Sequence, residues 1–407
     1  MERAGSSFAI SRVNLLVAST QRAVPEGPTD GDCTPSLAQT TKERSMKSTL
    51  KALSHHTRLF GITAALIMLC SATQAADLKG KEAVLWSSGG KYTTALEEAY
   101  VKPFEAETGA KIRLVEADVD AMIGAVSAQV KAGNVEWDGL SGLDAPYMPK
   151  FIKDGLIEKI DVSKIPGLEK LPKALRSDYG VPVLNSVVTV SYRNADNIAP
   201  LKSVKDFFDP NIKGARVVSS LAGEAQMVCA LALLSDGVSV EELSKGFDID
   251  RCLKIVDRIK NQITAYWANG SQMAQLMIDN SVDYCLCWDG RIIQAAQANP
   301  QWKIQHNGGI QFPGYFTYTK GTKNADVLDA FAVYMLDPKR QAEFTKLVGY
   351  SSPNPDSVAY LPDNLKPFIS VTPEAQAVLT ALPDSLLEAM SRQQVELGRA
   401  WQAYVGK

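Results

Sequence analysis

Short apolar runs alternate with amphipathic stretches from residue 81 onward. Residues 83–86, 111–115 and 137–141 are apolar or alternating runs that predict strands. Between them, residues 96–104 and 122–133 repeat apolar positions every three to four residues, which indicates helices. This order predicts a mostly parallel sheet that is covered by helices on both faces.

The same pattern returns after a long extended segment at residues 181–193. Residues 214–220 and 282–288 predict two further strands, and a helix is expected to begin near Gly223. The remaining predicted elements are a turn at 307–309, a strand at 315–319 and a C-terminal helix at 385–404. Together these elements predict two α/β lobes that are joined by extended segments.

The N-terminal part of the chain has the three parts of a secretory signal. Basic residues precede the apolar run 59–70, and small residues follow it. The run of 12 residues is shorter than the roughly 20 that span a bilayer. We therefore expect a cleaved signal peptide at 46–76, whereas 1–45, which lack apolar periodicity, are expected to be a non-native upstream extension.

Composition excludes several classes of function. The 407 residues are 22% charged and 45% hydrophobic, and the net charge of −2 provides no basic surface for nucleic acid. Only three histidines occur, and two of them, His55 and His56, precede the first predicted strand. The glycine pair at 89–90 is not a phosphate loop, because Leu85 and Tyr92 stand where that motif needs glycine and Ser or Thr. We expect no enzyme activity, no cofactor and no metal.

Four cysteines follow the predicted signal peptide. A disulfide between Cys229 and Cys252 is possible, but the sequence does not decide it. Cys285 and Cys287 are two residues apart on a predicted strand, where a bond would be strained, so we expect two buried thiols.

Candidate ligand-binding residues gather where predicted strands end. In open α/β sheets, ligands bind at the carboxyl ends of strands and at the N-termini of helices. Hydroxyls, indoles, acids and one arginine at such places suit a small polar ligand with an apolar middle. The candidates are Trp86, Ser87, Ser88, Tyr92, Ser141, Ser220, Glu224, Trp267, Trp288, Asp289, Arg291 and Tyr315.

Several candidates also have a purely structural interpretation. Trp86 and Trp288 are large enough to be core residues. Asp289 could cap a helix, Glu224 could be a favourable acid in a first turn, and Arg291 could be a solvated side chain.

Four segments in order resemble the bacterial extracellular solute-binding proteins of the spermidine/putrescine-binding type. They are the strand ending in Trp-Ser-Ser-Gly-Gly with 101–109, the pair 137–141 and 154–158, the extended segment 181–192, and 351–355 with 360–362. The resemblance covers nearly all of residues 81–365. It implies a periplasmic-binding-protein fold that is type II-like, with a ligand cleft between two lobes and a hinge of two crossing strands.

The resemblance also implies a role and a domain layout. We expect a monomeric periplasmic receptor that delivers a small-molecule solute to an inner-membrane permease of the ATP-binding-cassette (ABC) type and its ATPase subunits. Lobe 1 is expected at 77–185 and 314–350, lobe 2 at 186–313, and C-terminal helices that pack on the lobes at 351–407.

The residues expected to hold the ligand depart from the polyamine receptors. Those receptors tend to hold ammonium groups with several acids, whereas this chain has Arg291, Gly314 and Met227 where three of them are expected. Glu224 is kept. A guanidinium repels a dication and grips a carboxylate with two hydrogen bonds. We therefore expect a zwitterion or small carboxylate, such as a 4-aminobutyrate-like or opine-like compound.

Three alternatives stay open at this point. A true polyamine receptor would bind spermidine through Glu224. An exported enzyme on the same scaffold would need a catalytic group that we do not find. A receptor that presents its ligand to a signalling protein would have the same sequence features as a transport receptor.

Overall fold

The computed structural model describes residues 78–406. The predicted upstream extension at 1–45 and signal peptide at 46–76 lie outside the described residues and stay predictions. Within the described part, no helix combines the length and the apolar composition that a bilayer crossing requires.

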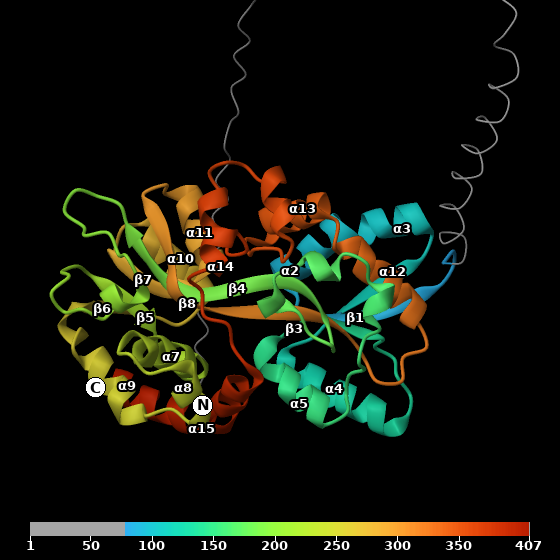
Figure 1. Ribbon diagram of the computed structural model, residues 1–407, viewed down its shortest axis with the longest axis horizontal. Coiled ribbons are helices and arrows are strands. Elements are labelled where there is room, and N and C mark those ends of the chain that lie inside the picture. The colour runs from blue at the N-terminus through green and yellow to red at the C-terminus, as the bar shows by residue number, and fades with distance from the viewer. Residues whose placement is uncertain (1–77, 407) are drawn as a thin grey trace, which may run out of the picture. The chain divides into compact units, whose positions relative to one another are not determined.

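Eight strands form one continuous sheet in the order β2-β1-β3-β8-β4-β7-β5-β6 (Figure 1). At one end, β1 pairs in parallel with β2 and β3; at the other, β5 pairs in parallel with β6 and β7. These strands are β1 (Glu82–Ser87), β2 (Lys111–Glu116), β3 (Gly139–Asp144), β5 (Arg216–Ser219), β6 (Ile263–Trp267) and β7 (Tyr284–Trp288). The predicted α/β class is confirmed.

Two long antiparallel strands, β4 (Val181–Arg193) and β8 (Trp302–Tyr318), run through the middle of the sheet and connect its two ends. Each strand contributes side chains to two different hydrophobic cores along its length. Leu184 and Phe316 pack in the core beside β1 and β2, whereas Val188 and Phe312 pack in the core beside β5. We call the half around β1–β3 lobe 1 and the half around β5–β7 lobe 2.

The predicted turn at 307–309 is wrong. Gly308 has a φ of +84°, and the pairing of β4 with β8 shifts register between Val188 and Val190. A glycine takes such a φ without strain, so the strand bulges and continues.

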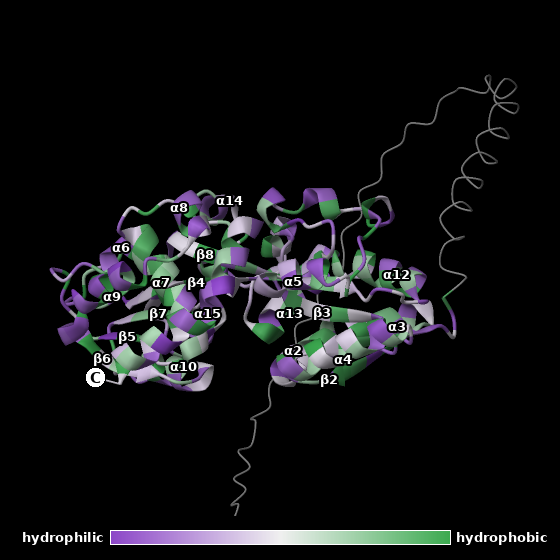
Figure 2. Cartoon of the chain, turned by 90° about the horizontal axis from the view of Figure 1, so that it is seen from below, coloured by the Kyte–Doolittle hydropathy of each residue, from purple (hydrophilic) through white to green (hydrophobic). Residues whose placement is uncertain are grey.

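Helices cover the sheet in both lobes, and in Figure 2 hydrophobic and hydrophilic residues mix along them. Gly109 and Gly133 end two helices in left-handed conformations. The helices of lobe 1 are α2 (Gly90–Leu96), the π-helical η1 (Glu97–Val101), α3 (Lys102–Thr108), α4 (Val119–Ala132), η2 (Ala145–Tyr147), α5 (Met148–Lys153), α12 (Ala325–Met335) and α13 (Pro338–Val348). Those of lobe 2 are α6 (Val204–Phe207), η6 (Ala222–Glu224), α7 (Ala225–Ser235), α8 (Val240–Lys245), α9 (Ile249–Asp257), α10 (Gly270–Ile278) and α11 (Asp289–Ala298).

The C-terminal helix α15 (Asp384–Val405) lies close to its predicted position at 385–404. Met390, Leu397 and Trp401 are buried in the core of lobe 2, whereas Leu387 is buried among side chains of lobe 1. The helix therefore contacts both lobes. Before it come the short helix α14 (Pro373–Gln376) and single 3₁₀ turns that include η8 (Pro355–Tyr360) and η9 (Lys366–Phe368).

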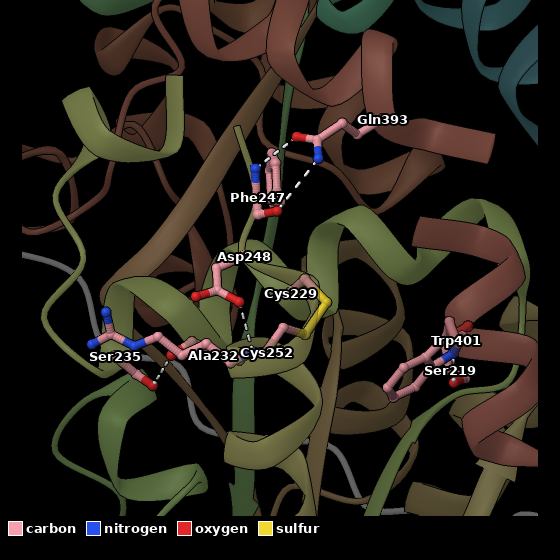
Figure 3. Close-up of a disulfide and its surroundings, with 10 residues drawn as sticks. Ser219, Cys229, Ala232, Ser235, Phe247, Asp248, Cys252, Gln393 and Trp401 are labelled. Carbon is pink, nitrogen blue, oxygen red and sulfur yellow. Dashed lines mark hydrogen bonds between the residues drawn. A yellow bond between two sulfur atoms is a disulfide. The ribbon is translucent and has the colours of Figure 1, made fainter. Parts of the chain in front are cut away.

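Cys229 of α7 and Cys252 of α9 form a disulfide inside lobe 2 (Figure 3). Cys285 and Cys287 of β7 are buried, as expected, but the structure joins them where we expected two thiols. Because side chains alternate along a strand, residues two apart lie on the same face, and this brings the two sulfurs side by side.

Candidate functional site

A cavity of about 670 Å³ lies between the lobes. Seven of the twelve sequence candidates line it: Trp86, Ser88, Tyr92, Glu224, Trp267, Trp288 and Arg291. They come from the ends of β1, β6 and β7 and from the helices and turns that follow β1, β5 and β7. This is the edge that the strand-end argument predicts.

On the lobe 1 side, the end of β1 carries Trp86. Its indole Nε1 donates to the carbonyl oxygen of Ala117 at 2.9 Å, and only 2% of the residue is exposed. Trp86 is thus both a core residue and part of the cavity wall. Tyr92, in the helix that follows, donates its hydroxyl to the carbonyl oxygen of Ser141. Burial and nearby Asp144 raise the pKa of the Tyr92 phenol far above its usual range, so it stays neutral.

On the lobe 2 side, a carboxylate and an indole form a pair. Trp288 Nε1 lies 3.2 Å and 3.3 Å from the two carboxyl oxygens of Glu224. Burial raises the pKa of Glu224, and the indole hydrogen bond opposes this shift. The Trp288 ring also packs edge-on against Phe312 of β8, with 5.5 Å between ring centroids. Glu224 is therefore held at the wall and not left to solvent.

Arg291 lies in the first turn of α11, against the start of α10. Its Nη1 donates to Gln294 Oε1 at 3.1 Å. Gly270, the first residue of α10, leaves space for it, because a Cβ there would lie 2.4 Å from Arg291 Nε. Asn269 and Gly270 also line the cavity. A guanidinium beside a helix N-terminus favours an anionic group at this place.

Five candidates do not line the cavity. Ser87 is buried and hydrogen-bonds Thr93 at 2.7 Å, and Ser141 donates to the carbonyl oxygen of Trp86 at 2.7 Å. Ser220 donates to the carbonyl oxygen of Trp267 at 3.0 Å. The last two, Asp289 and Tyr315, are buried beneath the wall. Each of the three serines has its hydroxyl satisfied by a neighbouring segment, which is a structural role.

Asp289 has a defined place in the hinge. Its Oδ1 accepts from the backbone N–H groups of Val187, on the crossing strand β4, and of Gly290. Its Oδ2 is buried and has no hydrogen-bond partner among the described residues. Burial raises the pKa of this carboxyl to about 8.

An acid and a base on the lobe 1 side also line the cavity, although neither is among the sequence candidates. Asp144 ends β3, and Lys150 lies in α5; both line the cavity with Tyr147. Asp144 is exposed at the cavity, and partial desolvation by the protein around it raises the pKa of its carboxyl to about 6. Asp144 lies opposite Gly314 in the pairing of β3 with β8. The structure therefore places a carboxyl group directly across the sheet from Gly314.

The remaining wall comes from segments far away in the sequence. Ser186 and Leu184 of β4, Tyr350, and Ser391 and Gln394 of α15 all line the cavity. Only the tertiary packing brings them to the site. The cavity therefore presents two acids, two bases, three indoles and several uncharged polar groups.

Among the described residues, no group of three or more His, Cys, Asp or Glu side chains is placed to hold a metal ion. The ionisable residues on the wall occur as one acid–indole pair and separate charges. This arrangement suits reversible binding of a polar ligand through hydrogen bonds and charge contacts.

Comparison with known proteins shows the family of this chain. The family model described as "Bacterial extracellular solute-binding protein" matches residues 99–376. A "Gamma-aminobutyric acid-binding protein" of Pseudomonas aeruginosa is 25% identical over 303 residues, which cover 74% of this chain and 84% of the relative. A "Spermidine/putrescine-binding periplasmic protein" of Salmonella typhimurium is 25% identical over 255 residues, covering 59% of this chain and 71% of that protein.

Two solved structures extend the comparison. An ABC transporter substrate-binding protein from Bradyrhizobium japonicum is 27% identical, with a TM-score of 0.64 over 80% of this chain and 99% of that one. The protein AgtB from A. tumefaciens R10, solved in complex with agropinic acid, is 27% identical, with a TM-score of 0.55 over 81% of this chain and 99% of that one. These likenesses confirm the expected two-lobed binding-protein fold.

Proposed function

Because this chain belongs to the bacterial extracellular solute-binding proteins, we propose that it captures a small zwitterion, 4-aminobutyrate or an opine-like compound, in the cavity between its lobes. It is the substrate-binding component of an ABC transporter and not an enzyme. The remaining question is therefore which solute the cavity accepts and which residues hold it.

The observation that carries the proposal is the presence of both signs of charge on an otherwise aromatic wall. Arg291 offers a guanidinium beside the start of α10, and Glu224 offers a carboxylate that is oriented by Trp288. A carboxylate ligand group suits the former and an ammonium group the latter. Trp86, Trp267 and Trp288 then cover the apolar middle of the ligand.

Two relatives support this choice of ligand class by their names. One is called a gamma-aminobutyric acid-binding protein, and one was solved with agropinic acid. Both ligands carry carboxylates. Delivery to a membrane permease and its ATPase completes the proposed role, and export to the periplasm would place the receptor beside that permease.

A polyamine receptor remains the second candidate because of one observation. Asp144 and Glu224 both line the cavity, and two acids are suited to the two ends of a diamine. Arg291 and Lys150 also line this cavity, one from each lobe, and oppose this ligand because like charges repel. We therefore favour the zwitterion.

The direct test is the affinity of Arg291→Ala for 4-aminobutyrate by isothermal titration calorimetry. A charge-assisted hydrogen-bonded pair contributes about 1.5–3 kcal/mol, so affinity is expected to fall by about 10- to 100-fold. Arg399→Ala, an exposed arginine on α15 outside the cavity, is the matched control. Unchanged affinity in Arg291→Ala would remove Arg291 from the site.

A further inference from the structure

The segment that carries Glu224 into the cavity has few contacts of its own. Residues 220–224 leave β5 and form η6, a single 3₁₀ turn whose first residues have no side-chain cap. Within lobe 2, Ser220 bonds the carbonyl oxygen of Trp267 through its backbone N–H at 2.8 Å and through its hydroxyl. Trp288 orients the carboxyl group of Glu224, and the place of its backbone depends on what packs behind this turn.

Helix α15 packs there. Trp401 Nε1 donates to the carbonyl oxygen of Ser219 at 3.0 Å, from a position 182 residues later in the chain (Figure 3). Gln402 donates to the carbonyl oxygen of Ser220. Trp401 is 1% exposed, so its indole is held by the core of lobe 2. The two carbonyl groups that precede η6 are thus fixed by the end of α15.

One turn earlier, α15 touches η6 itself through a glycine. A Cβ at Gly398 would lie 3.0 Å from the carbonyl oxygen of Ala222 and 3.2 Å from its Cβ. Such contacts are tighter than ordinary packing, so a side chain at position 398 requires a shift of a few tenths of an ångström between α15 and η6. The helix is fixed further along by Gln393, whose Oε1 accepts from the backbone N–H of Phe247 at 2.6 Å. Because α15 is held at both places, η6 is the part that yields.

We propose that Gly398 and Trp401 are positioning residues, which set the place of Glu224 in the cavity and thereby the preference of the receptor for ligands that carry an amine. The role of Glu224 as the amine partner rests on the proposed function. The positioning of Glu224 by α15 does not depend on it.

Gly398→Ala tests the positioning without relying on loss of the fold. Alanine is a better helix former than glycine, and this gain offsets the contact with Ala222. We expect the melting temperature to change little. Arg399→Ala, the next residue on the exposed side of α15, is the control. Trp401→Phe is the second variant, because it keeps the ring and removes the N–H donor.

The first readout needs no ligand. The pKa of Glu224, followed by the carboxyl carbon signal in NMR, is raised in the wild type by burial. We expect Gly398→Ala and Trp401→Phe to return it toward its ordinary value, and Arg399→Ala to leave it unchanged. If both variants keep the wild-type pKa of Glu224, the inference is wrong.

The second readout separates this inference from the proposed function. We expect Gly398→Ala to weaken 4-aminobutyrate binding about tenfold, and to have no further effect when Glu224 is already Gln. Equal weakening in both backgrounds would show that α15 acts through another group and would overturn the inference. If Glu224→Gln alone leaves binding intact while the pKa readout moves, the positioning holds and the amine assignment fails.

Discussion

Leu386 and Leu387 are neighbours in the sequence, yet their side chains are buried in the cores of opposite lobes. Leu386 packs with α7 and α8 in lobe 2, and Leu387 packs in the lobe 1 core that contains Trp86 and Tyr315. The first turn of α15 therefore connects the lobes in addition to the crossing strands β4 and β8.

We expect alanine substitutions at Leu386 and Leu387 to have different effects. Leu386→Ala removes packing within lobe 2 and should lower the unfolding free energy by about 2–5 kcal/mol without altering the distance between the lobes. Leu387→Ala removes packing between the lobes and should broaden the distribution of lobe distances, measured by double electron–electron resonance between spin labels on exposed sites. Equal distributions in the two variants would contradict the connecting role of Leu387.

Gly270→Ala should weaken carboxylate binding while the protein stays folded. The new Cβ would lie 2.4 Å from Nε of Arg291, so this flexible side chain must move away from the start of α10. We expect 4-aminobutyrate affinity to fall by about tenfold in calorimetry, since one charge-assisted contact is weakened. Gly124→Ala, a helix position with nothing near the added Cβ, is the control. An unchanged affinity in Gly270→Ala would argue against Arg291 as the carboxylate partner.

Asp289 predicts a pH dependence of stability. Its folded-state pKa of about 8 lies above its ordinary value of 3.8, so the folded state holds a proton that the unfolded state has lost. The contribution of Asp289 to the free energy of unfolding is therefore most favourable below about pH 4. It decreases by up to about 1.4 kcal/mol per pH unit as the pH rises to 8. Denaturant unfolding of Asp289→Asn between pH 5 and pH 8 should show a flatter slope than the wild type. The same slope in both proteins would contradict the raised pKa.

Asp144 predicts a pH dependence of binding. Its pKa of about 6 in the ligand-free protein means that it loses its charge as the pH falls below that value. If it helps Glu224 to hold an ammonium group, 4-aminobutyrate affinity should decrease between pH 7.5 and pH 5. Asp144→Asn should bind more weakly at pH 7.5 and depend less on pH. A variant with the full wild-type pH profile would exclude Asp144 from ligand contact.

The order of the strands and helices could be predicted from the sequence, because local sequence signals agree with the fold. Gly109 and Gly133 end helices, and the extended segment at 181–193 is the strand β4 with those bounds. The bulge at Gly308 was mistaken for a turn, since a glycine pair carries the same local signal in both cases.

The site was only partly accessible from the sequence. Trp86, Glu224 and Arg291 follow the ends of predicted strands and line the cavity. The third strand, however, is predicted to end at residue 141, whereas β3 continues to Asp144. Applying the strand-end argument to the true strand end would have found Asp144. Gln394 could not be found in this way, because a long-range contact of α15 brings it to the cavity.

The most direct test of the proposed function is a thermal-shift and calorimetry panel on residues 76–407. The panel holds 4-aminobutyrate, amino acids, opines, aminophosphonates, dicarboxylates, putrescine and spermidine. A ligand at one hundred times its dissociation constant adds about 2.7 kcal/mol to stability. We predict stabilisation by a zwitterionic, carboxylate-bearing compound and none by polyamines. Stabilisation by putrescine or spermidine alone would contradict the role assigned to Arg291 and the proposed ligand class.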